Sequence, residues 1–222
     1  MTAPIRIENS TAEVLIETPI TPTNKVVIFL PGVSGDAFSD RFQPIVEACT
    51  GAGFSTARVN AWKDVRELGQ KNLKQIYGDI NSVVALLRSK GYLYIFGVGK
   101  SFGGAILLTL PSTHITSKIL WAPAIGVTES GSNINTYLSA PLGSLKSLLD
   151  IKVDRAFLEK IEIPILIIHG TADDTIPFSN SEQLVSMLPK AKLVAIDGAD
   201  HSYRIKEYED AVITATVNFL TT

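Results

Sequence analysis

The chain has 222 residues, of which 45% are hydrophobic and 19% are charged, and its formal net charge is −2 at pH 7. A chain of this length can bury a substantial core, and the composition is that of an ordinary globular protein. The slightly negative charge argues against a general nucleic-acid binder, which would display a basic surface. We therefore expect a single domain over residues 1–222 and no nucleic-acid partner.

Redox and targeting features favour a cytoplasmic location. The single cysteine, Cys49, cannot form an intramolecular disulfide, and we expect a buried structural thiol. Residues 1–10 lack the basic start and apolar run of a secretory signal, and no stretch approaches the roughly 18 apolar residues that span a bilayer. The expected protein is soluble and cytoplasmic, without a membrane span, and the sequence carries no signal for an oligomeric state.

Hydrophobic periodicity predicts the secondary-structure elements in chain order. Residues 5–20 alternate in polarity and can supply antiparallel edge strands. The other expected strands are 25–30, 54–59, 92–96, 118–121, 163–168 and 193–196, and the expected helices are 39–51, 73–89, 101–110, 178–188 and 206–220. Strands that are apolar on both faces and alternate with amphipathic helices indicate a mostly parallel central sheet with helices on both faces. The predicted fold class is α/β.

Residues 124–162 depart from this alternation. The segment lies between two expected strands and contains Gly126, Gly131, Pro141 and Gly143. It is long for a plain crossover, and long connections in compact domains often cover functional sites. Two interpretations stay open, namely a short lid-like insertion and a crossover that holds one or two helices.

A serine at a strand-to-helix junction is the sharpest local signal. Gly99-x-Ser101-x-Gly103 directly follows an expected strand and directly precedes an expected helix. In that context the motif forms a sharp, strained turn that projects the serine hydroxyl above the sheet. The glycines permit the close approach that such a turn needs, and the N–H of Phe102 points at the same space. We predict that Ser101 is a nucleophile.

The same residues invite a competing interpretation. Gly99-Lys100-Ser101 resembles the end of a phosphate-binding loop, G-x-x-x-x-G-K-[ST]. That motif requires a glycine at position 94, where this chain has Tyr94, and the loop is too short to wrap a triphosphate. The phosphate-binding interpretation therefore fails.

Four motifs occur in the order that α/β-hydrolases show. They are Phe29-Leu30-Pro31-Gly32, Gly99-Lys100-Ser101-Phe102-Gly103-Gly104, His169-Gly170-Thr171-Ala172-Asp173-Asp174-Thr175-Ile176-Pro177 and Gly198-Ala199-Asp200-His201. From about residue 25 to the C-terminus the chain resembles the α/β-hydrolase superfamily, particularly small members similar to dienelactone hydrolases and compact esterases or acyl-peptidases. The resemblance implies an α/β-hydrolase fold and a serine hydrolase that needs no cofactor.

A serine hydroxyl needs a base to take its proton, and histidine suits this role near neutral pH. The chain has three histidines. His114 lies in a polar turn and is expected at the surface. By the resemblance, His169 supports the loop of the acid in a structural, hydrogen-bonded role. His201 alone follows both the serine and the candidate acids, in the Ser…Asp…His order of this fold, and is the predicted base.

The third group must accept a hydrogen bond from the far nitrogen of the imidazole. Asp173 and Asp174 both follow the expected strand 163–168. The resemblance favours Asp173, which occupies the acidic position of the family pattern, and Asp174 is the reserve, otherwise a solvated or helix-capping carboxylate. Asp200 adjoins His201, which rarely allows the required geometry, and is expected to be a turn residue.

Acyl transfer also needs two donors for the negative oxygen of the tetrahedral intermediate. The backbone N–H of Phe102 is one candidate, and by the resemblance the N–H of Val33 is the other. Many relatives carry histidine where this chain has Pro31 and Lys100. Neither difference removes a group that the reaction requires. Both differences weaken any argument that assigns the substrate of a particular subfamily to this chain. Lys100 is expected to be solvated or ion-paired.

The leading hypothesis is hydrolysis of an ester, thioester or amide through an acyl-Ser101 intermediate, with no metal and no organic cofactor. The sequence shows no Cys/His cluster with zinc-ligand spacing. The alternatives are a non-catalytic binding or scaffolding protein on the same fold, and a carbon–carbon bond hydrolase or acyltransferase that uses the same residues. The expected partner is a small or medium acyl substrate. Candidate pocket walls, all of which are also plausible core residues, are Phe38, Trp62, Phe102, Tyr137 and Leu138.

Overall fold

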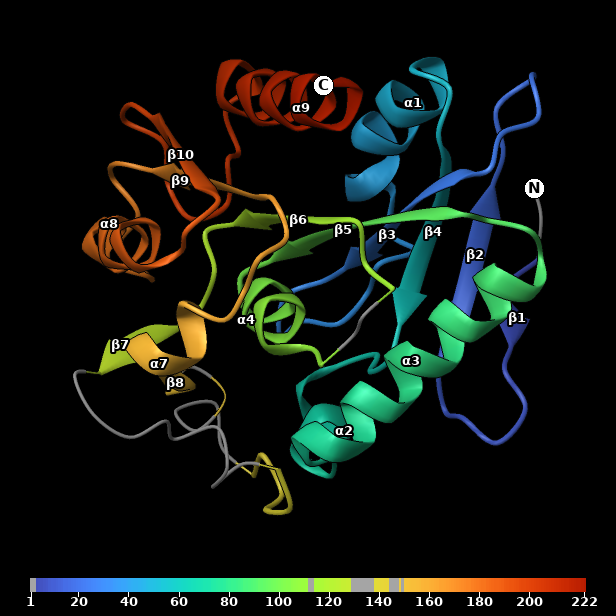
Figure 1. Ribbon diagram of the computed structural model, residues 1–222, viewed down its shortest axis with the longest axis horizontal. Coiled ribbons are helices and arrows are strands. Elements are labelled where there is room, and N and C mark those ends of the chain that lie inside the picture. The colour runs from blue at the N-terminus through green and yellow to red at the C-terminus, as the bar shows by residue number, and fades with distance from the viewer. Residues whose placement is uncertain (1–2, 112–113, 129–137, 144–147, 149) are drawn as a thin grey trace.

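The computed structural model describes residues 3–111, 114–128, 138–143, 148 and 150–222. Within these residues an eight-stranded sheet runs in the order β1-β2-β4-β3-β5-β6-β9-β10 (Figure 1). The strands are β1 Ile5–Arg6, β2 Glu13–Glu17, β3 Lys25–Leu30, β4 Ser55–Asn60, β5 Tyr94–Lys100, β6 Ser117–Trp121, β9 Ile165–Gly170 and β10 Ala191–Ile196. All strands from β4 to β10 in this order pair in parallel, and β1 and β2 add an antiparallel edge. The predicted α/β class and the antiparallel edge strands are confirmed.

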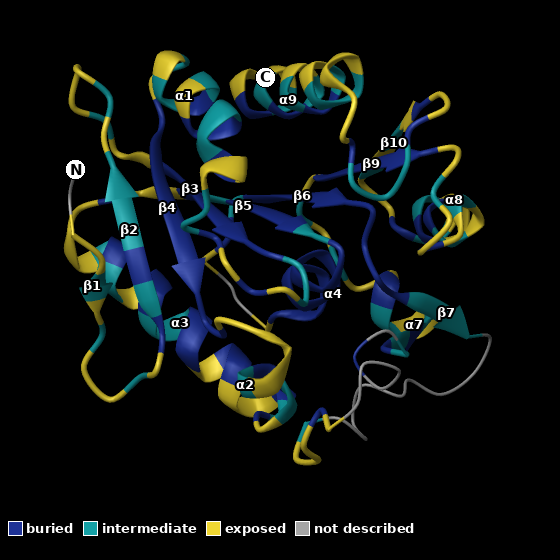
Figure 2. Cartoon of the chain, turned by 180° about the vertical axis from the view of Figure 1, so that it is seen from behind, coloured by how far each residue is buried: buried dark blue, intermediate teal, exposed yellow. Residues whose placement is uncertain are grey.

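Helices cover both faces of this sheet. Helices α1 (Gln43–Gly51) and α9 (Lys206–Thr221) lie together on one face, and α3 (Leu73–Ser89), α4 (Phe102–Thr109) and α8 (Phe178–Met187) lie on the other (Figure 1). Shorter helices are η1 (Asp40–Phe42), α2 (Val65–Gly69) and α7 (Arg155–Leu158). Figure 2 shows the central strands buried, with the exposed residues on the outer sides of the helices.

Successive residues of the central strands feed two separate cores. In β3, Val26 and Ile28 pack into the core under α3 and α4, whereas Val27 and Phe29 pack into the core under α1 and α9. Side chains of a strand alternate between the two faces, so a strand buried on both faces must be apolar throughout. Cys49 of α1 is fully buried in the second core, as predicted, and burial raises the pKa of its thiol to about 12.

Helix α3 begins and ends where its flanking residues require. The Asn72 side chain accepts a hydrogen bond from the Gln75 N–H, and the Gln75 side chain accepts one from the Asn72 N–H, which completes a capping box. After the helix, Gly91 takes a positive φ of 92° that glycine adopts without strain.

Some elements differ from the sequence prediction. β5 continues to Lys100, because Gly99 still pairs with Leu30 of β3 and Lys100 with Trp121 of β6. Within 124–162, β7 (Gly126–Thr128) and β8 (Lys152–Asp154) pair in parallel as a second small sheet, followed by α7. Residues 129–137, 144–147 and 149 of this segment lie outside the described residues, so the lid-like insertion stays a prediction.

The parallel sheet places several loops at one edge. The segments after β3, β5, β9 and β10 leave the carboxyl ends of neighbouring parallel strands, where the ligand sites of open α/β sheets lie. These segments contain Val33, Ser101, Asp173 and His201. Among the described residues, no helix is both long and apolar enough to cross a membrane.

Candidate active site

Ser101 sits at the sharp turn between β5 and α4. Its backbone has φ 52° and ψ −118°, a strained conformation for a residue with a side chain. The turn is held by hydrogen bonds from the Ser101 N–H to the Trp121 carbonyl (2.8 Å) and from the Ala124 N–H to the Ser101 carbonyl (3.0 Å). The strain is therefore balanced by contacts with the segment that ends β6.

The glycines of the motif allow this turn to form. A Cβ on Gly99 would clash with the backbone of Gly103, and a Cβ on Gly103 would clash with the carbonyl oxygens of Leu30 and Pro31. The backbone of α4 at Gly103 consequently lies directly against the backbone at the end of β3, with no space for a side chain between them. This agrees with the reason for which glycine is expected at these positions.

The structure brings together the three side chains that the sequence analysis singled out. The Ser101 Oγ lies 3.1 Å from Nε2 of His201, and Nδ1 of His201 lies 2.7 Å from Oδ2 of Asp173. An ionised carboxylate only accepts, so Nδ1 carries the proton and Nε2 is free to accept the serine proton. The result is one continuous hydrogen-bonded chain from hydroxyl to carboxylate.

Asp173 is held as an anion by four donors. Its Oδ1 accepts from the N–H groups of Thr175 (2.9 Å) and Ile176 (2.8 Å), and its Oδ2 accepts from His201 and from Nε2 of His169 (3.0 Å). Burial alone would raise the pKa of this carboxyl, but the hydrogen bonds from the two histidines and Ile176 outweigh it and hold the pKa far below its usual value. The group is thus fully ionised near neutral pH.

The neighbouring acids lie elsewhere. Asp174 is exposed, and its carboxylate accepts only from the Thr175 hydroxyl (3.3 Å) among the described residues. Asp200 accepts from the N–H groups of Ser202 (3.0 Å) and Arg204 (3.4 Å), which is the geometry of a turn residue. The geometry thus favours Asp173 over both, as predicted, while its catalytic role stays a prediction.

The hydrogen bonds of His169 place a proton on its Nε2. Its Nε2 lies 3.1 Å from the Ile176 carbonyl and 3.0 Å from Asp173, and both of these groups only accept. Nε2 therefore carries a proton, and Nδ1 is hydrogen-bonded to the Ser181 hydroxyl at 2.6 Å. The ring is fully buried, and this hydrogen-bonded position agrees with the structural role predicted for His169. His114, in contrast, is exposed.

The loop that carries His201 is anchored from three sides. The Tyr203 hydroxyl donates to the Ile168 carbonyl at 3.0 Å, and Arg41 Nη2 donates to the Ser202 carbonyl at 2.6 Å. The backbone of Ala199 lies so close to Gly170 that a Cβ there would clash with it. Sequence reasoning missed Tyr203 and Arg41, because neither belongs to a motif and both act through contacts between distant segments.

The loop after β3 lies against the serine. A Cβ on Gly32 would be 3.5 Å from the Ser101 Cβ. The Gly32 carbonyl accepts from Nε1 of Trp62 (3.0 Å) and from the Gly35 N–H (3.1 Å). Because this carbonyl shares a planar trans peptide with the Val33 N–H, fixing one fixes the direction of the other. The N–H groups of Val33 and Phe102 have no acceptor among the described residues, so the oxyanion-hole prediction stays open to test.

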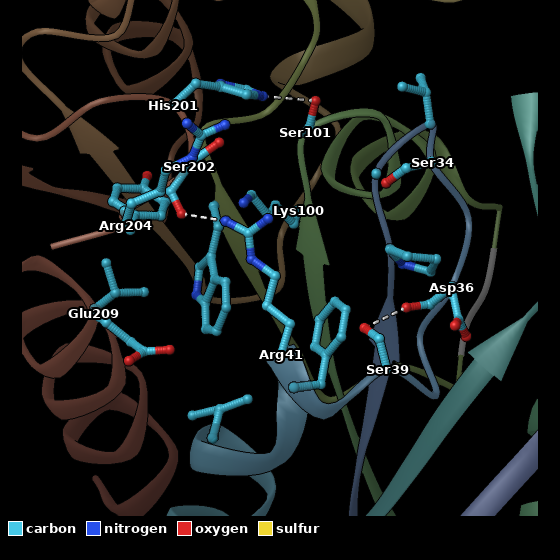
Figure 3. Close-up of a pocket in the computed structure, with 18 of the residues that line it drawn as sticks. Ser34, Asp36, Ser39, Arg41, Lys100, Ser101, His201, Ser202, Arg204 and Glu209 are labelled. Atoms are coloured by element: carbon cyan, nitrogen blue, oxygen red, sulfur yellow. Dashed lines mark hydrogen bonds between the residues drawn. The ribbon is translucent and has the colours of Figure 1, made fainter. Parts of the chain in front are cut away.

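A cavity of about 460 Å³ opens beside Ser101 and His201 (Figure 3). Its wall includes apolar side chains from α1, β6 and α9, together with charged groups that Figure 3 labels. The lining residues used below are Arg41, Lys100, Trp121, Arg204, Glu209, Val212 and Ile213.

Four of the five candidate pocket walls are described residues, and none of these four lines this cavity. Trp62 and Phe102 are fully buried and pack edge to face with ring centroids 5.3 Å apart, so they are core residues. Phe38 and Leu138 do not line the cavity beside Ser101, and Tyr137 lies outside the described residues. The pocket is instead built on the side of the sheet that α1 and α9 cover.

Of the two expectations for Lys100, the described residues provide no ion pair, and a solvated side chain stays a prediction. The side chain is half-buried and lines the cavity, and it forms no ion pair with any residue that the structure describes. Its ammonium lies 5.8 Å from the centroid of the Tyr203 ring. The sharp turn at Ser101 directs the serine side chain above the sheet and the Lys100 side chain toward the loop that carries His201. The described residues also contain no group of three or more His, Cys, Asp or Glu side chains that could hold a metal ion.

Comparisons with known proteins agree with this architecture. Residues 150–222 match the family model described as TAP-like protein. Over 82 residues, 37% of this chain, the sequence is 30% identical to a pimeloyl-[acyl-carrier protein] methyl ester esterase of Aromatoleum aromaticum. The match spans about a third of that relative's length.

Two solved structures illustrate the similarity in three dimensions. Est1E from Butyrivibrio proteoclasticus with bound ferulic acid has a TM-score of 0.77 at 18% identity, covering 99% of this chain and 98% of that one. A bromoperoxidase from Bacillus anthracis has a TM-score of 0.73 at 19% identity, covering 99% of each. The chain therefore has the α/β-hydrolase fold, as its motifs predicted. Because one of these structures is named a bromoperoxidase whereas the curated relative is named an esterase, the fold by itself does not assign an activity here.

Proposed function

We propose that the protein is a serine hydrolase that cleaves an ester, thioester or amide through an acyl-Ser101 intermediate, with His201 as base and Asp173 orienting it. The observation that carries this proposal is the hydrogen-bonded chain from Ser101 to Asp173 at the wall of the cavity. A carboxylic ester is the first bond to test, because the curated relative is named a methyl ester esterase. The substrate is a small molecule.

In the first half of the reaction, the Ser101 Oγ attacks the substrate carbonyl carbon while its proton passes to Nε2 of His201. Asp173 stabilises the imidazolium that forms. The N–H groups of Val33 and Phe102 donate to the oxygen that becomes negative, and a donor of this kind is worth about 10²–10³ in rate. Collapse of the intermediate breaks the bond to the alcohol, which takes the proton from Nε2 and leaves the acyl-serine.

In the second half, water attacks the acyl-serine. His201 takes a proton from the water as its oxygen bonds to the carbonyl carbon, and the same donors hold the oxyanion. Collapse then releases the carboxylic acid, and the proton on Nε2 returns to the Ser101 Oγ. The cycle needs neither a metal nor an organic cofactor.

Turnover of p-nitrophenyl acetate and p-nitrophenyl butyrate by the purified protein tests the proposal. We expect release of p-nitrophenolate by the wild type and a loss of at least about 10³-fold in kcat in Ser101→Ala, because among the described residues only the Ser101 hydroxyl is hydrogen-bonded to Nε2 of His201. Circular dichroism would verify that the variant is folded. Equal turnover by the variant and the wild type would contradict the proposal.

A further inference from the structure

Lys100 is a half-buried cation at the candidate site that forms no ion pair with a described carboxylate. It directly precedes Ser101 and lines the same cavity. Burial first, and then the nearby charge of Arg41, lower the pKa of its ammonium to about 8, although Asp200 and Asp173 act in the opposite sense. Holding a cation in such surroundings without an ion pair costs free energy, and a ligand of opposite charge would recover it.

Two further cations share this cavity. Arg41 and Arg204 both line it, and neither forms an ion pair with a described carboxylate. Arg41 is anchored by one hydrogen bond to the Ser202 carbonyl, which leaves other guanidinium N–H groups for a ligand. In Figure 3 the Arg41 guanidinium and Lys100 are drawn in the same part of the cavity, below Ser101 and His201, and the charge of Arg41 acts on the Lys100 ammonium.

The remaining lining limits the charge and shape of the ligand. Asp36 and Glu209 also line the cavity, so three cations face two carboxylates. This balance suits a monoanion better than a dianion such as a phosphate monoester. Trp121, Val212 and Ile213 add apolar surface that can contact a short hydrocarbon chain.

We propose that the cavity takes esters that carry a carboxylate a few bonds from the scissile carbonyl, with the carboxylate held by Lys100 and Arg41. An arginine offers paired N–H donors to the two carboxylate oxygens, and a lysine adds a point charge. The apolar wall holds the chain that joins the carboxylate to the ester. This substrate class rests on the proposed hydrolase function, whereas the anion site itself can be tested without catalysis.

Two pairs of substrates distinguish the position of the carboxylate. Monomethyl adipate against methyl hexanoate places the charge on the acyl side, and 4-acetoxybenzoate against its methyl ester places it on the alcohol side. We expect kcat/KM to favour the charged member by at least about tenfold in one pair, and this ratio to fall about tenfold in Lys100→Met, as charge-assisted hydrogen bonds are worth roughly one decade or more. The control Lys192→Met removes an exposed lysine of β10 and should keep the ratio.

Binding of hexanoate supplies a readout that needs no turnover. Trp121 lines the cavity and its fluorescence should report occupancy. We expect hexanoate to bind more tightly than hexanol or hexyl phosphate, and its Kd to rise about tenfold in Lys100→Met. Ester cleavage with no charge preference and no hexanoate binding would overturn the anion site and leave the hydrolase proposal intact. Lys100-dependent hexanoate binding without cleavage of any ester would overturn the hydrolase proposal and keep the anion site.

Discussion

At the level of single residues, the carboxylate of Asp173 accepts hydrogen bonds from two histidine rings. One of its oxygens accepts from both His169 and His201, and the other accepts from two backbone N–H groups. The carboxylate therefore cannot rotate without breaking several hydrogen bonds at once. This fixes the ring of His201 with Nε2 toward Ser101. Asp174, one residue later, has none of these contacts.

The substitution Asp173→Asn tests whether Asp173 or Asp174 is the acid that orients His201. The amide cannot accept from His201 as a carboxylate does, so the wrong tautomer of His201 is favoured and kcat should fall by on the order of 10³–10⁴. Asp174→Asn is the matched control, because it makes the same chemical change on an exposed side chain. Ester turnover of both variants measures the effect. A large loss in Asp174→Asn with little loss in Asp173→Asn would show that the acid is assigned to the wrong residue.

At the scale of elements, the junction of β5 and α4 combines a strained serine with two glycines that have no room for a side chain. Gly103 in particular lies against the carbonyl oxygens at the end of β3. Any side chain there must push α4 away from the loop that carries Val33. The junction therefore sets the distance between the nucleophile and both predicted oxyanion donors.

The substitution Gly103→Ala tests this arrangement. Relief of the clash moves backbone rather than a flexible side chain, so we expect the free energy of unfolding to fall by about 1–3 kcal/mol and kcat to fall at least tenfold. Gly78→Ala is the control. It lies exposed inside α3, where an added Cβ meets nothing within 4 Å, and should stabilise the protein by up to about 1 kcal/mol. Urea denaturation and ester turnover measure both, and a fully active, stable Gly103→Ala would refute this account of the junction.

At the scale of the whole molecule, a buried ion pair connects the N-terminal edge to the helical layer. Asp79 of α3 accepts from Lys71 Nζ (3.0 Å), from the Ser10 hydroxyl (2.6 Å) and from Thr11, and Lys71 also donates to the Ala61 carbonyl. Burial raises the pKa of Asp79, but these hydrogen bonds outweigh it and leave the pKa below its usual value. The cluster holds the segment between β1 and β2 against α3.

The substitution Asp79→Asn removes the nearer of two carboxylates from the buried Lys71 and leaves Glu67 at 3.4 Å, so the free energy of unfolding at pH 7 should fall by about 3 kcal/mol. Because the pKa of Asp79 is lower folded than unfolded, its contribution is present above about pH 4 and is lost as the pH falls further. The difference between wild type and variant should therefore shrink below pH 4 in urea denaturation. Asp210→Asn, which breaks an exposed pair with Lys206, should change stability little. A difference that stays constant down to pH 3 would contradict the assignment.

The local pattern was sufficient to predict what depends on neighbours in sequence. The apolar strands and the Gly-x-Ser-x-Gly turn follow from residues close to one another in the chain. The choice of Asp173 and His201 relied instead on the order of distant motifs and on the family resemblance. Other features depend on contacts across the fold, such as the hydrogen bond from Trp62 to Gly32 and the anchoring of the His201 loop by Arg41 and Tyr203. These contacts join segments that are far apart in the sequence, so neither the periodicity nor the spacing of residues predicts them. The orientation of the Lys100 side chain depends on the strained backbone of the turn at Ser101, which a sequence pattern does not specify.

Intact-protein mass spectrometry after reaction with a fluorophosphonate tests the central claim most directly. The reagent reacts with a serine whose proton is taken by a neighbouring base, so it reports the hydrogen-bonded chain of Ser101 without a guess about the substrate. We expect one adduct per chain on the peptide that contains Ser101, no adduct in Ser101→Ala and much slower formation of the adduct in His201→Ala. A folded wild-type protein that forms no adduct, or an adduct that persists in Ser101→Ala, would contradict the central claim.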